Sequence, residues 1–336
     1  MIRVGLIGAG TMGRVHAAAY RQLEAAHLAM ICDRVVEKGH QLAGTGVRAV
    51  QDYREVLENP NIDLVDVCLP TYLHREVVTA AAAAGKHVFC EKPIALSVED
   101  AQEMMQICQK AGVKLGIGHV VRFFPDYSKA KVLVESGRVG DPKVVRTSRG
   151  GSFPRWSQDN WFADYAKSGG PIVDLIIHDI DWLLWMFGPV KRVFAKSVRK
   201  EESKEQLLDH ALVTLRFENG IIAHLEGSWA QPEGTPFATS FEIAGTKGLY
   251  QYSKKRSTPL LVRTAKGENQ AQSVPESPLA LDPYTAQLEA FLEAIMEDSE
   301  VPVSGLEAAR ALEVALAARR SADTGEVVHL GGDHNA

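Results

Sequence analysis

The chain has 336 residues, enough for two ordinary domains, and 46% of them are hydrophobic, as in an average globular protein. Its formal net charge of −5 gives no reason to expect nucleic acid as a partner. No apolar run approaches the roughly 18 to 20 residues of a membrane span, and we expect neither a secretory signal nor a membrane partner. The four cysteines form no CxxC pair, so we expect buried thiols and a cytoplasmic location.

The N-terminal third alternates apolar runs with amphipathic helical stretches. Strands are predicted at 2–7, 28–32, 47–50, 64–69, 87–90 and 115–118, and helices at 12–23, 36–43, 53–57, 74–84 and after Ser97. These strands are almost continuously apolar, as parallel strands buried on both faces must be. The pattern predicts an α/β domain over residues 1–121, built on a doubly wound parallel sheet.

The C-terminal two thirds show a different pattern. A helix is predicted at 125–136, longer alternating strands at 211–217, 221–229, 237–244 and 249–253, an edge strand at 260–263, and closing helices at 284–295 and 306–321. Asn219-Gly220 predicts a hairpin turn in which both residues take positive φ angles. Residues 122–336 should therefore form an α+β domain, with helices on one face of an open, largely antiparallel sheet.

A glycine-rich turn joins the first strand to the first helix. It contains Gly8, Gly10, Thr11, Met12 and Gly13 in the spacing GxGxxG. Glycine at these positions permits a tight turn, a close approach by phosphate groups and close packing of helix on strand. The N–H groups and dipole of the helix then suit a pyrophosphate. The turn predicts a dinucleotide site, although a purely structural turn without a ligand would show the same pattern.

Two residues at the end of the second strand bear on which dinucleotide binds. Asp33 lies 20 residues after Gly13, where a carboxylate can accept hydrogen bonds from the adenosine ribose hydroxyls. A 2′-phosphate would be repelled there, which favours NAD. Arg34 could instead bind that phosphate or lie over the adenine, so NADP stays open.

Lys92 is the first candidate for the chemical step. The segment Glu91-Lys92-Pro93 directly follows the predicted strand at 87–90, and open α/β sheets bind ligands at such strand ends. Pro93 restricts Lys92 to extended geometry. A lysine there could hydrogen-bond a substrate hydroxyl and stabilise a developing alkoxide. From spacing alone, a surface-loop lysine is an equal alternative.

Asp174 and His178 are the second candidates. They are four residues apart in a strongly apolar segment, so on a helix they share a face and need polar partners. Imidazole is the natural proton acceptor near neutral pH. A satisfied core histidine and a metal site are the alternatives. No third ligand has suggestive spacing, so we expect no metal.

Several motifs together resemble the glucose–fructose oxidoreductase/inositol dehydrogenase (Gfo/Idh/MocA) family. They are the GxGxxG start, Pro70-Thr71-x-x-His74 with Thr where Asn is frequent, Glu91-Lys92-Pro93, Arg122-Phe123, Gly169-Gly170-x3-Asp174-x3-His178, and the closing Gly305…Ser321-Ala322…Gly325. The resemblance runs from residue 2 to about residue 330.

This resemblance implies an N-terminal Rossmann domain and a C-terminal domain whose open sheet makes homodimer or homotetramer contacts. It implies that Lys92 polarises the substrate oxygen, that His178 is the general base, and that Asp174 orients the substrate through its hydroxyls. It also implies that further residues lie near the cofactor, namely Pro70, Thr71, His74, Glu91 and Arg122. The substrate would be a polyol, an inositol, a sugar or a sugar derivative.

Three further residues are candidate substrate contacts. In the family, the stretch containing Trp156, Asn160 and Trp161 borders the substrate, and an indole could cover the C–H face of a sugar. Aromatic packing against the sheet is an equal alternative. Two other functions also fit the motifs: a glycosidase that uses NAD for a transient oxidation, and a non-catalytic NAD sensor.

Overall fold

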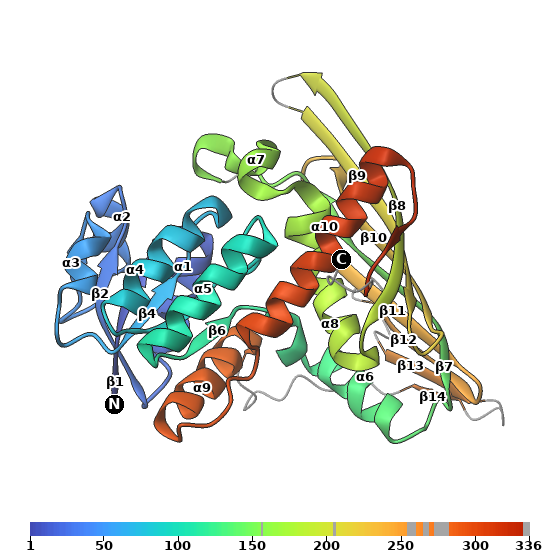
Figure 1. Cartoon of the computed structure of the whole chain (residues 1–336), viewed down its shortest axis with the longest axis horizontal. Helices are drawn as coiled ribbons and strands as arrows, with labels where there is room; N and C mark the ends of the chain where they lie inside the picture. Colours follow the sequence, from blue (N-terminus) through green and yellow to red (C-terminus); the bar gives the residue numbers. More distant parts are fainter. Residues whose placement is uncertain (156, 204–205, 254–259, 265–268, 272–281, 332–336) are drawn as a thin grey trace. The chain divides into compact units, whose positions relative to one another are not determined.

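The computed structural model describes residues 1–155, 157–203, 206–253, 260–264, 269–271 and 282–331 (Figure 1). They divide into two compact units. The first comprises Met1–Phe123, Ala166–Ser168 and Leu281–Leu312, and the second Phe124–Tyr165, Gly169–Ala280 and Glu313–Ala336. Within the described residues, no helix is both long and apolar enough to cross a bilayer.

The first unit is built on a six-stranded parallel sheet in the order β3-β2-β1-β4-β5-β6. Its strands are β1 (Ile2–Ile7), β2 (Ala26–Cys32), β3 (Arg48–Val50), β4 (Leu64–Val67), β5 (His87–Cys90) and β6 (Leu115–Ile117). Its helices are α1 (Thr11–Tyr20), α2 (Val36–Leu42), α3 (Tyr53–Leu57), α4 (His74–Ala83) and α5 (Val98–Ala111), with short 3-10 turns at Thr71–Leu73 and Val120–Phe123. The predicted doubly wound fold is confirmed.

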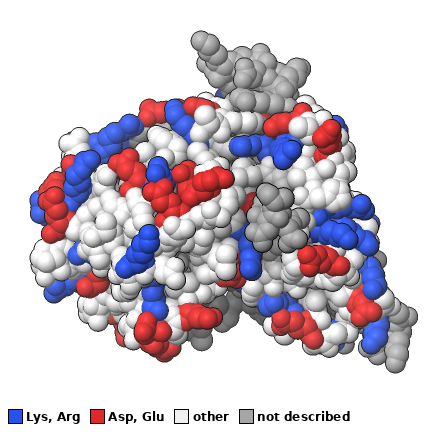
Figure 2. Space-filling model, viewed as in Figure 1, with Lys and Arg blue, Asp and Glu red and all other residues white. Residues whose placement is uncertain are grey.

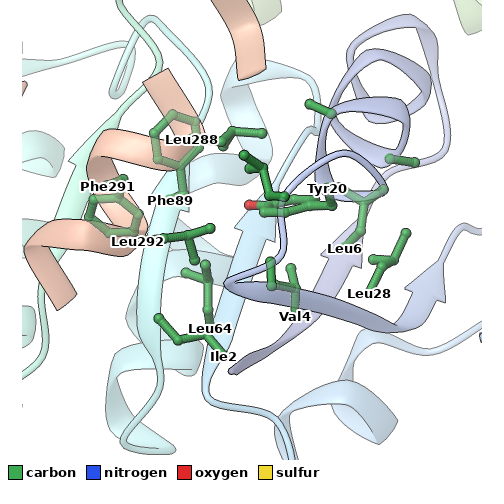
Figure 3. Close-up of a cluster of buried hydrophobic side chains, with 14 of the residues drawn as sticks. Ile2, Val4, Leu6, Tyr20, Leu28, Leu64, Phe89, Leu288, Phe291 and Leu292 are labelled. Atoms are coloured by element: carbon green, nitrogen blue, oxygen red, sulfur yellow. The ribbon is translucent and has the colours of Figure 1, made fainter. Parts of the chain in front are cut away.

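A helix from the end of the chain completes the core of the first unit. Helix α9 (Pro283–Met296) places Leu288, Phe291 and Leu292 against the side chains of β1, β4 and β5 (Figure 3). The Phe291 ring packs on Phe89 of β5, with 5.3 Å between the ring centroids. No sequence pattern predicted this return, because an apolar stripe on a helix does not identify the surface that it covers.

The second unit holds a nine-stranded sheet in the order β14-β13-β12-β11-β7-β10-β9-β8-β15, in which the pair β7–β10 is parallel. Its strands are β7 (Pro142–Ser152), β8 (Val190–Ser203), β9 (Gln206–Phe217), β10 (Ile222–Gln231), β11 (Ala238–Gly245), β12 (Gly248–Ser253), β13 (Leu260–Thr264), β14 (Asn269–Ala271) and β15 (Val328–His329). Helices α6 (Pro125–Glu135) and α8 (Ile177–Phe187) cover one face (Figure 1), and α10 (Gly305–Thr324) runs from the first unit into the second.

Side chains alternate across this sheet as the sequence predicted. Ala211, Val213 and Leu215 of β9 are buried, whereas the intervening Leu212 is 52% exposed. The sequence analysis missed β7, β8, β14 and β15. The predicted edge strand at 260–263 is not an edge, because β13 pairs with both β12 and β14.

The Asn219-Gly220 hairpin differs from its prediction. Gly220 has a φ of 89°, but Asn219 is not among the described residues with positive φ. Phe217 and Ile221 close a three-residue loop, in which a helical turn precedes a left-handed glycine. The Asn219 side chain holds this geometry, since its amide donates to the Phe187 carbonyl (2.8 Å) and its oxygen accepts from the Ile221 N–H (3.2 Å).

Candidate cofactor and active site

The glycine-rich turn is shaped by close backbone packing. Gly8 has a φ of 104°, and a Cβ there would lie 2.4 Å from the Cys68 carbonyl oxygen. A Cβ on Gly13 would lie 1.8 Å from the Gly8 carbonyl oxygen. Neither position can accept a larger residue without moving the backbone, so both glycines are needed for the turn itself.

The space around Gly10 is open, unlike that around Gly8 and Gly13. It is the N-cap residue of α1, no side chain caps this helix end, and a Cβ on Gly10 would meet no atom within 4 Å. Thr11 is exposed and Met12 half-buried at the start of the helix. The first turn of α1 therefore presents backbone N–H groups to open space, which fits a dinucleotide pyrophosphate.

Asp33 lies at the end of β2 and braces this turn. Its Oδ2 accepts the Ala9 N–H (2.8 Å) and its Oδ1 accepts the Val35 N–H (2.8 Å). Each carboxylate oxygen keeps a second lone pair, and the side chain is partly exposed, so ribose hydroxyls can still donate to it. The neighbouring Arg34 is exposed. The bracing role was not predicted.

His74 joins the loop after β4 to the loop after β5. Its ring is fully buried, with Nε2 2.8 Å from the Leu69 carbonyl oxygen and Nδ1 2.9 Å from that of Pro93. Burial lowers the pKa of His74, although the two carbonyl contacts oppose that shift. Thr71 is buried beside it on the chain, whereas Pro70 is half-buried. This histidine therefore holds the two loops together.

Lys92 lies in the loop after β5 and is half-buried. The peptide bond between Lys92 and Pro93 is cis. The preceding Glu91 is buried, and its Oε2 accepts the backbone N–H of Lys92 (3.2 Å). Since β1, β2, β4 and β5 are parallel, Lys92 lies at the same edge of the sheet as the glycine turn and Asp33. The topology thus brings these predicted residues to one edge.

A buried charged cluster next to this loop was missed by the sequence analysis. His16 of α1 has its Nδ1 2.8 Å from Asp66 Oδ2 and its Nε2 3.2 Å from Glu91 Oε1. Burial disfavours the imidazolium, but the Asp66 charge and hydrogen bond outweigh it, so the pKa of His16 lies well above its ordinary value. Burial alone would raise the pKa of Glu91, yet His16 and Lys92 together hold it below its usual range.

The sequence did contain a signal for this cluster. Asp66 is an acidic residue inside the apolar run Leu64–Cys68, and a buried charge requires a partner. His16, Asp66 and Cys68 also have ligand atoms within 4.8 Å of one another. Those atoms contact each other directly, and burial raises the pKa of Cys68, which keeps its thiol protonated and unsuited to ligation.

Arg122 has a protein partner in the first unit. Its side chain is buried, and its Nη1 donates to Glu307 Oε1 at 2.6 Å. The other Glu307 oxygen accepts the backbone N–H of Ser304 (2.9 Å) at the start of α10. Arg122, which lies in the turn after β6, therefore anchors the start of α10.

Asp174 and His178 belong to the second unit and lie on one continuous helical segment. Asp174 is in a π-helical turn (Ile172–Ile176), and His178 is in the first turn of α8. Asp174 is 7% exposed and His178 is half-buried. The next acidic residue, Asp179, forms a buried ion pair with Arg149, in which two guanidinium nitrogens donate to its carboxylate (2.6 and 2.9 Å). π-Helical turns occur frequently at functional sites.

Of the three predicted substrate contacts, Asn160 and Trp161 belong to the described residues. Trp156 lies outside the described residues. Trp161 stacks on Phe162, with ring centroids 4.0 Å apart, and packs against a cluster that includes Leu175 beside Asp174. Asn160 is exposed and has a positive φ of 46°. Trp161 is half-buried and thus packs against the segment that holds Asp174 while part of its ring stays accessible.

Comparison with known proteins identifies the family to which the chain belongs. The profile of an oxidoreductase family with an NAD-binding Rossmann fold matches residues 2–119, and that of the GFO/IDH/MocA C-terminal domain matches residues 127–251. The chain belongs to the GFO/IDH/MocA family.

Two relatives and one crystal structure illustrate this membership. Myo-inositol 2-dehydrogenase of Thermotoga maritima is 33% identical and is aligned over 98% of both chains. 1,5-Anhydro-D-fructose reductase of Ensifer adhaerens is 31% identical over 98% of this chain and 99% of its own. The structure of GenD2 from gentamicin A biosynthesis in complex with NAD has a TM-score of 0.86 at 26% identity, covering 98% of this chain and 97% of that one. This GFO/IDH/MocA protein is an NAD-binding oxidoreductase, and the predicted family, fold class and enzyme type are confirmed.

Proposed function

We propose that this GFO/IDH/MocA enzyme oxidises a secondary hydroxyl group of an inositol, a polyol, a sugar or a sugar derivative. The main support is Lys92, which follows β5 at the sheet edge that also carries the glycine turn and Asp33. The names of its relatives, an inositol dehydrogenase and an anhydrofructose reductase, give the substrate class. Inositols, polyols and sugars all carry several secondary hydroxyl groups.

The proposed chemistry divides one oxidation among three side chains. When bound, the nicotinamide supplies the hydride acceptor. The Lys92 ammonium donates a hydrogen bond to the reacting oxygen and stabilises the charge that develops there. The His178 imidazole accepts the hydroxyl proton, and the Asp174 carboxylate accepts hydrogen bonds from neighbouring hydroxyls of the substrate. Asn160, Trp161 and Trp156 remain proposed substrate contacts.

We propose NAD rather than NADP as the physiological cofactor. Asp33 supports this choice, because its carboxylate would face the ribose hydroxyls and repel a 2′-phosphate. The cofactor contacts that we propose are the turn residues Gly8, Gly10, Thr11, Met12 and Gly13, with further residues along the same sheet edge. These are Asp33, Arg34, Pro70, Thr71, His74, Glu91, Lys92 and Arg122.

We further propose that residues 1–121 bind the cofactor and residues 122–336 bind the substrate and a second copy of the chain. The uncovered face of the nine-stranded sheet supports assembly, since Phe194, Val198 and Leu212 are exposed there. A groove of about 370 Å³ crosses β7, β9, β10, β11 and β12. Light scattering should give a dimer or tetramer, and Leu212→Glu should shift it toward the monomer. A wild-type monomer at high concentration would remove this part of the proposal.

Surface charge supports the prediction of a small-molecule substrate, and the cysteines support the predicted location. On the face shown in Figure 2, acidic and basic side chains are interspersed and no extended basic patch covers the described surface, which suits a small substrate better than a polyanion. The four cysteines form no disulfide, which supports a cytoplasmic location.

A substrate panel tests the proposed function. Purified protein is assayed for NADH or NADPH formation with inositols, sugar alcohols, sugars and sugar acids. Steady NADH accumulation with at least one of these compounds is expected. Release of an aglycone without net NADH would instead indicate the glycosidase. NAD binding without turnover on any compound would indicate the sensor, and either result would overturn the proposal.

A further inference from the structure

Three ionisable side chains form a continuous buried chain beneath the Lys92 loop. Asp66, His16 and Glu91 come from β4, α1 and the end of β5, and their side chains are 0%, 0% and 8% exposed. They therefore connect three separate parts of the first unit. Nothing in the proposed hydride transfer requires any of them to touch the substrate.

The charged groups around His16 favour one protonation state. Its Nδ1 is hydrogen-bonded to Asp66 Oδ2 (2.8 Å) and lies 3.2 Å from Cys68 Sγ, and its Nε2 makes an ion-pair contact with Glu91 Oε1 at 3.2 Å. Each ring nitrogen therefore faces a carboxylate, and only the imidazolium carries a proton on both nitrogens. Burying two carboxylates is unfavourable unless a cation compensates them, and the imidazolium provides that charge.

Glu91 transmits this arrangement to Lys92. One carboxylate oxygen contacts His16, and the other accepts the backbone N–H of Lys92 at 3.2 Å. Gly118 leaves room for this carboxylate, because a Cβ at that position would lie 2.9 Å from Oε1. The His16 and Phe89 rings make an edge contact, with centroids 5.7 Å apart.

We propose that His16 is a positioning residue for Lys92, because it holds the Glu91 carboxylate that fixes the Lys92 peptide. Helix α1, which begins at the cofactor turn, then also sets the position of Lys92 at the end of β5. The support that this cluster gives is electrostatic: Asp66 and His16 share a hydrogen bond, and His16 and Glu91 form an ion-pair contact. The inference rests on the proposed catalytic role of Lys92.

Hydrogen exchange tests the geometric part without any turnover. His16→Gln keeps a polar side chain of similar reach but cannot donate to both carboxylates as a cation. In this variant the Lys92 amide should exchange at least about ten times faster, since its acceptor is no longer held. The Glu91 amide, which donates to the Val67 carbonyl (3.0 Å), is the internal control and should keep its rate. Equal acceleration of both amides, or none, would overturn the proposal.

Kinetics test whether that position matters for the reaction. His16→Gln should lower kcat at least about tenfold while the dissociation constant of NADH changes less than about threefold. Leu292→Ala is the matched control: it opens the same core and lowers stability without touching the loop, and it should keep kcat. Equal losses of kcat in the two variants would reduce His16 to a structural residue.

A double-mutant comparison shows whether His16 acts through Lys92. In a Lys92→Ala background, adding His16→Gln should change the remaining rate less than about twofold, because the group that His16 positions is gone. A full additional loss would contradict the inference. If the wild type turns over no compound of the panel, the proposed function falls, and the exchange experiment still decides whether His16 fixes the Lys92 peptide.

Discussion

The cofactor turn and the Lys92 loop lie at the same edge of one sheet, but different forces hold them. Backbone packing fixes the turn, because Gly8 and Gly13 leave no space for a Cβ. The loop is fixed by side chains: Glu91 holds the Lys92 N–H, His16 holds Glu91, and Asp66 holds His16. The turn is therefore sensitive to volume, whereas the loop is sensitive to charge and pH.

The first prediction separates volume from function within the turn and is the one expected to change both stability and binding. Gly13→Ala should destabilise the first unit by about 2 kcal/mol or more and weaken NAD binding more than about 100-fold, because its Cβ overlaps the Gly8 carbonyl. Gly10→Ala should fold normally, since its Cβ meets no protein atom, and should still weaken NAD binding by obstructing the phosphates.

Circular dichroism melting and fluorescence titration of NADH measure the two effects in parallel. If Gly13→Ala binds NADH as the wild type does, backbone packing does not control the turn. If Gly10→Ala binds unchanged, the open space in front of α1 is not the phosphate site.

The second prediction concerns the lysine that the loop presents. Lys92→Ala should lower kcat by about 10³-fold, as expected for the loss of a charged donor at the reacting oxygen. NADH affinity should change little, because the turn and Asp33 stay intact. Lys110→Ala is the matched control, since this lysine is exposed at the end of α5. Unchanged turnover in the Lys92 variant would show that another group stabilises the oxygen.

The contrast between the two regions also explains which features of the site could be predicted from the sequence. The glycine turn is a local pattern of six residues between a strand and a helix, so its place in the fold followed from the sequence. His16, Asp66 and Glu91 are separated by 50 and 25 residues along the chain (66 − 16 and 91 − 66) and become a cluster only when β4, β1 and β5 assemble. For the same reason the packing of α9 on β5 was missed, while both closing helices were located.

The third prediction concerns His178, which belongs to the second unit. His178→Gln should lower kcat by about 10²-fold and flatten its pH profile between about pH 6 and 8, where histidine general bases titrate. Asp179→Asn should instead lower stability, because Asp179 pairs with buried Arg149. An unaltered pH profile in His178→Gln would place the base elsewhere.

The fourth prediction tests the carboxylate beside the turn. Asp33→Asn should weaken NAD binding roughly tenfold, because the amide offers one oxygen where the carboxylate offers two. The preference between NAD and NADP should move toward NADP, since the repelling charge is removed. The ratio of the two kcat/KM values measures this shift. A constant ratio would leave Asp33 with only its bracing contacts to Ala9 and Val35.

The fifth prediction uses pH to distinguish the loop from the turn and has the smallest effect. The Asp66 charge outweighs burial and keeps the pKa of His16 well above its ordinary value of about 6.5, so the stability that His16 contributes is fully present below that pH. As pH rises toward the folded-state pKa, the free energy of opening of α1 should fall by about 1.4 kcal/mol per pH unit. In His16→Gln this slope should be absent.

Amide protection factors in α1 provide the measurement, because they correct for the intrinsic pH dependence of exchange. Tryptophan fluorescence is not suited to this opening, since the tryptophans that the structure describes, Trp161, Trp182, Trp185 and Trp229, all lie in the second unit. The lowered pKa of Glu91 acts in the opposite direction: its contribution is present above about pH 4.3 and disappears as pH falls through the folded-state value. A wild-type slope as flat as that of His16→Gln would mean that His16 is neutral when buried, and the loop would then be held by packing, like the turn.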